Sequence, residues 1–259
     1  MHAGSSGEAL EERAKQFGDE LLETLQGTVE SNAETFDYTV VETGSRALGT
    51  LRSTPQPYVQ LYAQGEGGLI PTFTMGIEYK VFFNDFLTVQ QSSIRLGLAG
   101  GGREEPIFRY EYLREPNGKT PSAHLHVHGH RDEFIHGMLL GTTGRPGKRH
   151  QGIQQKGTKA HLPTMSQVHF PLGGRRLRPG IEDVLELLIE EFGIAPAQEE
   201  WRPFLEKRRE QWRRIQTRAL VSRNVGFVKE ILDDLGYEVT PRGEGTDLAG
   251  QQDPALREY

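Results

Sequence analysis

The sequence predicts an α+β fold: an antiparallel β-meander sheet of six to eight strands, with an N-terminal helix and C-terminal helices packed on it. Apolar residues recur at helical spacing over residues 7–30, and again from residue 181 onward. Between these segments, from about residue 36 to residue 127, β-branched and aromatic runs alternate with short turn signals. Because short turns join consecutive strands, we expect antiparallel pairing.

The 259-residue chain divides into three predicted parts. Residues 1–194 form an α+β core domain that contains the N-terminal helix and a Gly-, Lys- and Arg-rich loop at residues 141–165. Residues 195–240 form a C-terminal helical extension. Residues 241–259 are rich in Gly, Pro and charge, which predicts a disordered tail.

The elements follow in chain order from local patterns. Leu10, Phe17, Leu21, Leu25 and Val29 fall on one face of a helix over residues 7–30. Asn84-Asp85 and Asn117-Gly118 are hairpin signals between apolar runs. The predicted strands cover residues 36–42, 58–63, 73–83, 87–98, 107–113, 123–128 and 167–172, and the predicted helices cover residues 181–192, 199–221 and 222–235, the last closed by Gly236.

Composition excludes several classes of protein. The chain has no cysteine, which excludes disulfides, thiolate metal sites and a cysteine nucleophile. No apolar run reaches the length of a bilayer span, and residues 1–7 lack the pattern of a secretory signal. We therefore expect a cytoplasmic protein with no membrane association.

The net charge of −6 hides a strong segregation of charge along the chain. Residues 141–180 carry 8 basic residues and no acidic one, whereas residues 181–200 carry 7 acidic residues and no basic one. Such a basic block is typical either of phosphate or nucleic-acid binding or of a solvated insertion. The candidate phosphate-binding residues are Arg145, Lys148, Arg149, Arg175, Arg176 and Arg178.

The most distinctive segment is the run His124-Leu125-His126-Val127-His128, followed by Gly129-His130. Side chains alternate between the two faces of a strand, so the histidines share one face while Leu125 and Val127 point into the core. If residues 167–172 pair with this strand, His169 joins the cluster. The expected carboxylate partner of the histidines is not evident, because Asp132 and Glu133 fall in the following turn.

This arrangement admits three chemistries and one structural interpretation. His124, His126 and His128 can ligate a metal, with zinc the possible cofactor. The same residues with His169 can act as metal-free general acids and bases, or one of them as a nucleophile at phosphorus. Alternatively, the histidines only fit among their neighbours on a solvated sheet face.

The histidine run resembles the His-φ-His-φ-His signature of histidine-triad nucleotide hydrolases and transferases, over about five residues. In that family the middle histidine is the nucleophile, which implies this role for His126.

A second resemblance concerns the layout of about residues 105–194. Strands carrying Arg109-Tyr110-Glu111-Tyr112, the Asn117-Gly118 turn, the histidine strand, the segment His169-Phe170-Pro171 and an apolar, acidic helix ending near Phe192 resemble TumE-like toxins of prokaryotic toxin–antitoxin modules. The resemblance implies an antiparallel sheet with helices, a bacterial source and RNA as the target.

Helix 199–221 interleaves arginines with Trp201, Phe204 and Trp212. This pattern suits nucleic-acid binding, a protein partner or homodimer contact, or a plain solvated helix. Taken together, the sequence favours a phosphodiester- or RNA-directed protein that uses its histidine strand. The alternatives are a non-catalytic interaction module with a structural histidine strand, and a zinc-binding protein.

Overall fold

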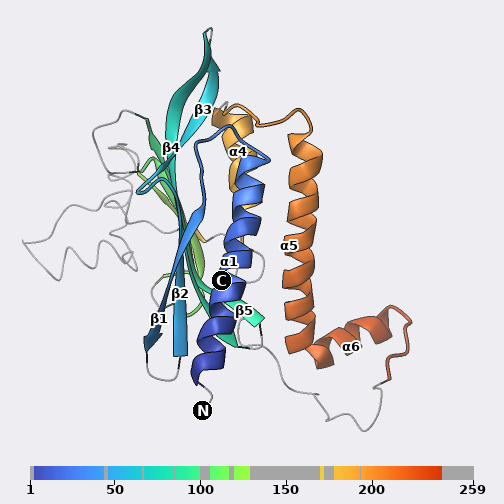
Figure 1. The fold of residues 1–259 in the computed structure, drawn as a ribbon. Coiled ribbons are helices and arrows are strands. Elements are labelled where there is room, and N and C mark those ends of the chain that lie inside the picture. Colours follow the sequence, from blue (N-terminus) through green and yellow to red (C-terminus); the bar gives the residue numbers. More distant parts are fainter. Residues whose placement is uncertain are drawn as a thin grey trace, which may run out of the picture.

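A computed structural model describes residues 3–43, 46–65, 67–84, 86–99, 106–116, 120–128, 170–171, 178–192 and 194–240. Within these residues the chain forms one antiparallel sheet with α1, α4 and α5 on the same side of it (Figure 1). The predicted α+β fold is therefore confirmed. The helices are α1 (Ala3–Gln26), α4 (Ile181–Phe192), α5 (Trp201–Arg223) and α6 (Val225–Asp234), and the strands are β1 (Phe36–Thr43), β2 (Arg46–Ser53), β3 (Val59–Gly65), β4 (Gly68–Asn84), β5 (Phe86–Leu98), β6 (Phe108–Leu113), β7 (Ala123–Val127) and β8 (Phe170–Pro171).

The eight strands that the structure describes run in the order β1-β2-β4-β5-β6-β7-β8, with β3 paired to the first half of β4. All of the pairings are antiparallel. The hairpin signal at Asn84 is confirmed, because β4 and β5 pair as far as Asn84 opposite Phe86. The β6–β7 hairpin is confirmed as well, although residues 117–119 of its turn lie outside the described residues.

Strand β2 was not predicted from the sequence. Its residues, Arg-Ala-Leu-Gly-Thr-Leu-Arg-Ser, include few of the β-branched and aromatic types that favour strands. Close packing explains why the strand has a glycine, Gly49, at its middle. A Cβ there would lie 3.0 Å from Val81 Cγ2 on the neighbouring strand and 3.8 Å from Leu10 on α1, so the small residue permits close helix–sheet packing.

The core lies between one face of the sheet and the helices. Leu10 and Leu25 of α1 are fully buried, which agrees with the predicted apolar face. The helix ends at Gln26 rather than at residue 30, and Val29, which is 1% exposed, lies beyond its end. Alternate residues of β4 are buried against this face, among them Met75 and Val81. Helix α4 adds Leu185 and Leu188, and the sheet residues Leu51, Leu61 and Leu96 complete the most buried part.

The C-terminal helices differ in how much they bury. Helix α5 lies beside α1 (Figure 1) and buries Leu205, while none of the described residues of α6 is buried. Gly236, just after α6, has a φ of +86°, the left-handed conformation expected of a helix-ending glycine. No helix among the described residues has both the length and the apolarity to cross a membrane.

Several predictions lie outside the described residues. These are the loop at residues 141–165 with Arg145, Lys148 and Arg149, the residues His169, Arg175 and Arg176, and the tail at residues 241–259. The division into a core domain and a helical extension stays a prediction.

Candidate functional site

The register of the sheet separates two faces with different chemistry. In the β6–β7 pair, Glu111 lies opposite His124 and Arg109 opposite His126. Tyr110 lies opposite Leu125 on the other face, where the helices pack. The predicted alternation of β7 is therefore correct: its histidines share the face away from the helices.

Glu111 joins the two histidines of β7 into one cluster. Its Oε2 lies 3.3 Å from Nε2 of His124 and 2.9 Å from Nε2 of His126. The candidate ligand atoms of these three residues all lie within 4.8 Å of one another. We call Glu111, His124 and His126 the Glu-His-His cluster.

The cluster is withdrawn from solvent. His124 is 1% exposed and His126 is 5% exposed, while the Glu111 side chain is 19% exposed. Burial alone raises the pKa of Glu111, but the hydrogen bonds from His124 and His126 and the charge of Arg109 outweigh it. The net effect holds the pKa of Glu111 far below its usual range, so the group is a carboxylate at neutral pH.

His124 has a second contact that orients its ring. Its Nδ1 lies 2.9 Å from the carbonyl oxygen of Pro121, just before β7. A carbonyl oxygen only accepts, so Nδ1 carries the proton and Nε2 faces Glu111. The short connection between β6 and β7 thus fixes which nitrogen of His124 points at the carboxylate.

Basic side chains border the cluster on the same face. Arg109 Nε lies 3.1 Å from Oε1 of Glu111, the oxygen not shared with the histidines. Arg95 on β5 pairs opposite Arg109, and its Nε donates to Ser93 Oγ at 3.4 Å. This part of the sheet therefore combines a carboxylate, two imidazoles and two guanidinium groups.

The other predicted site residues fall at different places. His128 follows β7, with its ring centroid 6.4 Å from that of His126, and is not among the three clustered ligand residues. The predicted pairing of residues 167–172 with the histidine strand is present at Phe170 and Pro171, and His169 lies outside the described residues.

Arg178 lies on the helix side of the sheet. Its guanidinium carbon is 3.9 Å from the centre of the Tyr112 ring and 5.0 Å from that of Trp212. Tyr112 shares its face with Ala123 and Leu125, opposite to the histidines. Phosphate binding by Arg178 stays a prediction, and it would concern a different site from the Glu-His-His cluster.

Glu111 is the functional candidate that sequence reasoning missed. A usable signal was present: with a hairpin turn at Asn117-Gly118, counting back along both strands places Glu111 opposite His124. Asp132 and Glu133, which follow the histidines closely in the sequence, lie outside the described residues.

No family model, curated protein or solved structure matches this chain. The resemblances to histidine-triad hydrolases and to TumE-like toxins therefore stay predictions.

Proposed function

We propose that the Glu-His-His cluster binds one divalent transition metal ion, zinc by preference, and that the protein uses it to hydrolyse phosphodiester bonds. The single observation that supports this most directly is the convergence of two imidazole Nε2 atoms on one carboxylate oxygen, at 3.3 and 2.9 Å.

The contacts of His124 favour a cation beside its ring. Because Nδ1 donates its hydrogen bond to the Pro121 carbonyl, a neutral His124 presents the lone pair of Nε2 to Glu111. The Glu111 oxygen is itself an electron-pair donor, because an ionised carboxylate only accepts hydrogen bonds. Two such atoms at 3.3 Å repel each other unless a positive charge lies between them, either a proton or a metal ion.

The distances and ligand types favour zinc among the metals. Two ligands of a tetrahedral zinc ion, each about 2.1 Å from it, lie about 3.4 Å apart. The separation of His124 and Glu111 is close to this value, and that of His126 and Glu111 is slightly shorter. Two histidines and one glutamate also form a ligand set that leaves the fourth zinc position to water, as catalytic zinc sites do.

The substrate class follows from the charges beside the cluster. Arg109 and Arg95 lie on the same face, and guanidinium groups bind phosphate oxygens in bidentate geometry. A metal-activated water can form a new P–O bond while the P–O bond to the leaving alcohol breaks and that oxygen takes up a proton. RNA is the first phosphodiester to test, because the TumE-like resemblance implies it.

Metal analysis of the purified protein tests the first half of the proposal. After dialysis we expect close to one zinc ion per chain, and less than a tenth of that in Glu111→Gln or His126→Ala. His128→Ala is the matched control: it removes the next histidine on the same face but none of the three clustered ligand atoms, so its zinc content should equal that of the parent.

A chain that holds no transition metal after exposure to zinc would overturn the metal site. The cation between His124 and Glu111 would then be a proton. Hydrolysis is tested with bis(p-nitrophenyl) phosphate and a short single-stranded RNA across a salt series. Cleavage that persists in His126→Ala and after metal removal would contradict a role for the cluster in the reaction.

A further inference from the structure

A cavity of about 440 Å³ lies between the sheet and the helices, and most of its lining residues have no part in the proposed metal site. Its walls come from α1, from strands β4 to β7, from residues 178–184 and from α5. This volume is within the range of small-molecule sites in proteins. The cavity shares strands β6 and β7 with the cluster, and its lining includes Glu111 and His124 but not His126.

Several aromatic side chains line one part of the cavity. Tyr110 and Tyr112 line it from the sheet, and Trp212 lines it from α5. The Arg178 guanidinium lies over the rings of both Tyr112 and Trp212, at 3.9 and 5.0 Å. Flat aromatic and guanidinium surfaces are the groups on which planar heteroaromatic ligands stack.

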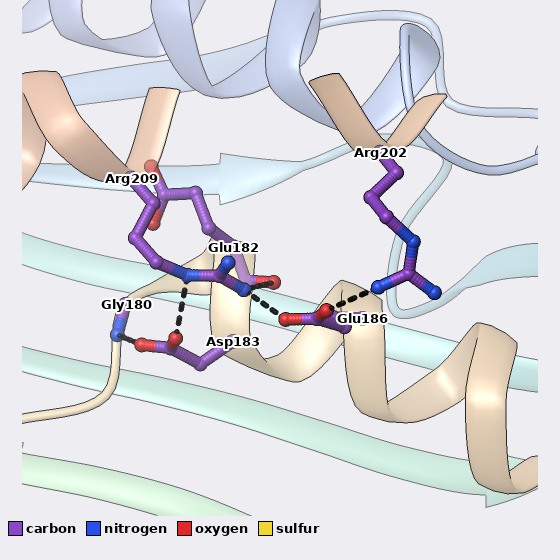
Figure 2. Close-up of polar contacts among 6 residues, drawn as sticks. All are labelled: Gly180, Glu182, Asp183, Glu186, Arg202 and Arg209. Carbon is purple, nitrogen blue, oxygen red and sulfur yellow. Dashed lines mark hydrogen bonds and ion pairs between the residues drawn. The ribbon is translucent and has the colours of Figure 1, made fainter. Parts of the chain in front are cut away.

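One buried carboxyl oxygen in the lining lacks a hydrogen-bond partner among the described residues. Glu182, in the first turn of α4, is 7% exposed, and its Oε2 has no hydrogen-bond partner among the described residues. The neighbouring carboxylates of the same helix are engaged: Asp183 accepts from Gly180 N and Arg209, and Glu186 accepts from Arg202 and Arg209 (Figure 2). The Glu182 side chain extends away from this network in Figure 2.

Gly180 gives independent evidence that Glu182 and Trp212 are closely packed here. A Cβ at Gly180 would lie 2.3 Å from Glu182 Oε2 and 2.4 Å from Trp212 Nε1. No side chain fits at position 180, and its absence lets the Glu182 carboxyl group and the Trp212 indole both lie next to the Gly180 backbone. A buried carboxyl held in this way without a donor is costly unless a ligand supplies one.

We infer that the cavity binds a planar heteroaromatic molecule with two adjacent N–H donors, the chemistry of a guanine base. The donor pair bonds to Glu182, and the ring lies against Tyr112, Trp212 and Arg178. A neutral donor fits better than an ammonium group, because Arg178 already places a positive charge at this site. The inference does not depend on the proposed metal site, because none of the residues that would bind the base belongs to the Glu-His-His cluster.

Tryptophan fluorescence provides a direct test. The chain has two tryptophans, so a Trp201→Phe variant reports on Trp212 alone. We expect saturable quenching by guanosine, weaker binding of inosine, which lacks the exocyclic donor, and no binding of adenosine, which lacks the donor pair. The same titration is repeated with a five-nucleotide RNA that contains one guanosine. Comparison of the two titrations shows whether the cavity binds a free nucleoside or a base within RNA.

Two variants of the full chain separate binding from general damage. Glu182→Gln should weaken guanosine binding at least about tenfold, because the acceptor pair for the two donors is lost. Glu210→Gln makes the same chemical change at a side chain that is 61% exposed and outside the cavity lining, and should leave the affinity unchanged. Circular dichroism confirms that both variants are folded.

The inference is overturned if neither guanosine nor the RNA quenches Trp212, or if Glu182→Gln binds as tightly as the parent. Binding that depends on Glu182 in either titration supports it and identifies the source of the base. Guanosine binding should also persist in His126→Ala, which removes a cluster residue that does not line the cavity, so failure of the metal site and failure of this cavity are distinguishable.

Discussion

Two glutamates on opposite faces of the sheet show how surroundings decide the charge of a side chain. Glu111 is held as a carboxylate, because the hydrogen bonds of two histidines and a neighbouring arginine outweigh its burial. Glu182 has its pKa raised, because burial dominates over its own backbone hydrogen bond and over Arg208 and Arg209. Glu111 is therefore suited to hold a cation, and Glu182 to receive a hydrogen-bond donor.

The raised pKa of Glu182 gives stability a defined pH dependence. The folded chain holds this proton more tightly than the unfolded chain does, so stability is lost as pH rises from the ordinary pKa of about 4.3 through the folded pKa. Replacing Glu182 by Gln removes this loss. We expect Glu182→Gln to change the free energy of unfolding little at pH 4 and to raise it at pH 7.5.

Urea unfolding of Glu182→Gln and the parent at the two pH values measures this difference. The groups that act on Glu182 come from several elements. Asp183 on α4 raises its pKa, whereas Arg208 and Arg209 on α5 lower it. Tyr79 on β4 and Arg178 also interact electrostatically with its carboxylate. An equal change in stability at pH 4 and pH 7.5 would show that titration of Glu182 is not the cause.

At the scale of elements, α5 is held to the rest of the structure by charged contacts more than by apolar burial. Leu205 is its one buried residue among those described. Arg208 donates to Thr24 Oγ1 at 2.9 Å and to the carbonyl of Glu20 on α1. Arg209 pairs with Asp183 at 2.9 Å and with Glu186 on α4 (Figure 2). Helix α5 thus closes the cavity through arginines that reach two other helices.

Arg209→Ala should lower the free energy of unfolding by about 1–3 kcal/mol, because its guanidinium is 15% exposed and bonds to two carboxylates. Arg214→Ala on the same helix is the matched control. Arg214 pairs with Glu210, but the two side chains are 79% and 61% exposed, so its loss should cost less than about 0.5 kcal/mol. Equal losses in urea unfolding would contradict the anchoring role of Arg209.

The elements also show where sequence reasoning succeeds and where it fails. Helix α4 was predicted with its observed bounds, because Pro179 and a clear apolar periodicity mark it. Strand β2 was missed, because Gly49 serves close packing with α1 rather than strand propensity. The histidine face was predicted from alternation alone. Glu111 and the cavity were not, because they depend on register between strands and on helices that meet far apart in the sequence.

At the scale of the whole molecule, the chain combines one sheet with two chemically different faces. The face without helices carries the Glu-His-His cluster and arginines, and the helix face carries the core and the aromatic cavity. Helix α1 and helix α5 are both required to enclose the cavity, since each contributes lining residues. Helix α6 lies beyond them and contributes none.

Removal of α6 should therefore leave the fold and the cavity intact. None of its described residues is buried, and its large apolar side chains Phe227 and Ile231 are 45% and 41% exposed. We expect the free energy of unfolding of a chain that ends at residue 224 to lie within about 1 kcal/mol of that of the full chain, because the truncation exposes little apolar area to water. Asn224 is kept because it is 2% exposed and donates to the carbonyl of Leu220.

Leu205→Ala in the full chain is the contrasting variant. Leu205 is 1% exposed, so its truncation leaves a cavity in the core and should cost about 2–5 kcal/mol. Urea unfolding of the three proteins ranks these effects, and Trp212 fluorescence reports whether the cavity wall is preserved. A large loss of stability in the chain ending at residue 224 would mean that α6 packs on the core, and that the exposed apolar residues of α6 contribute to folding.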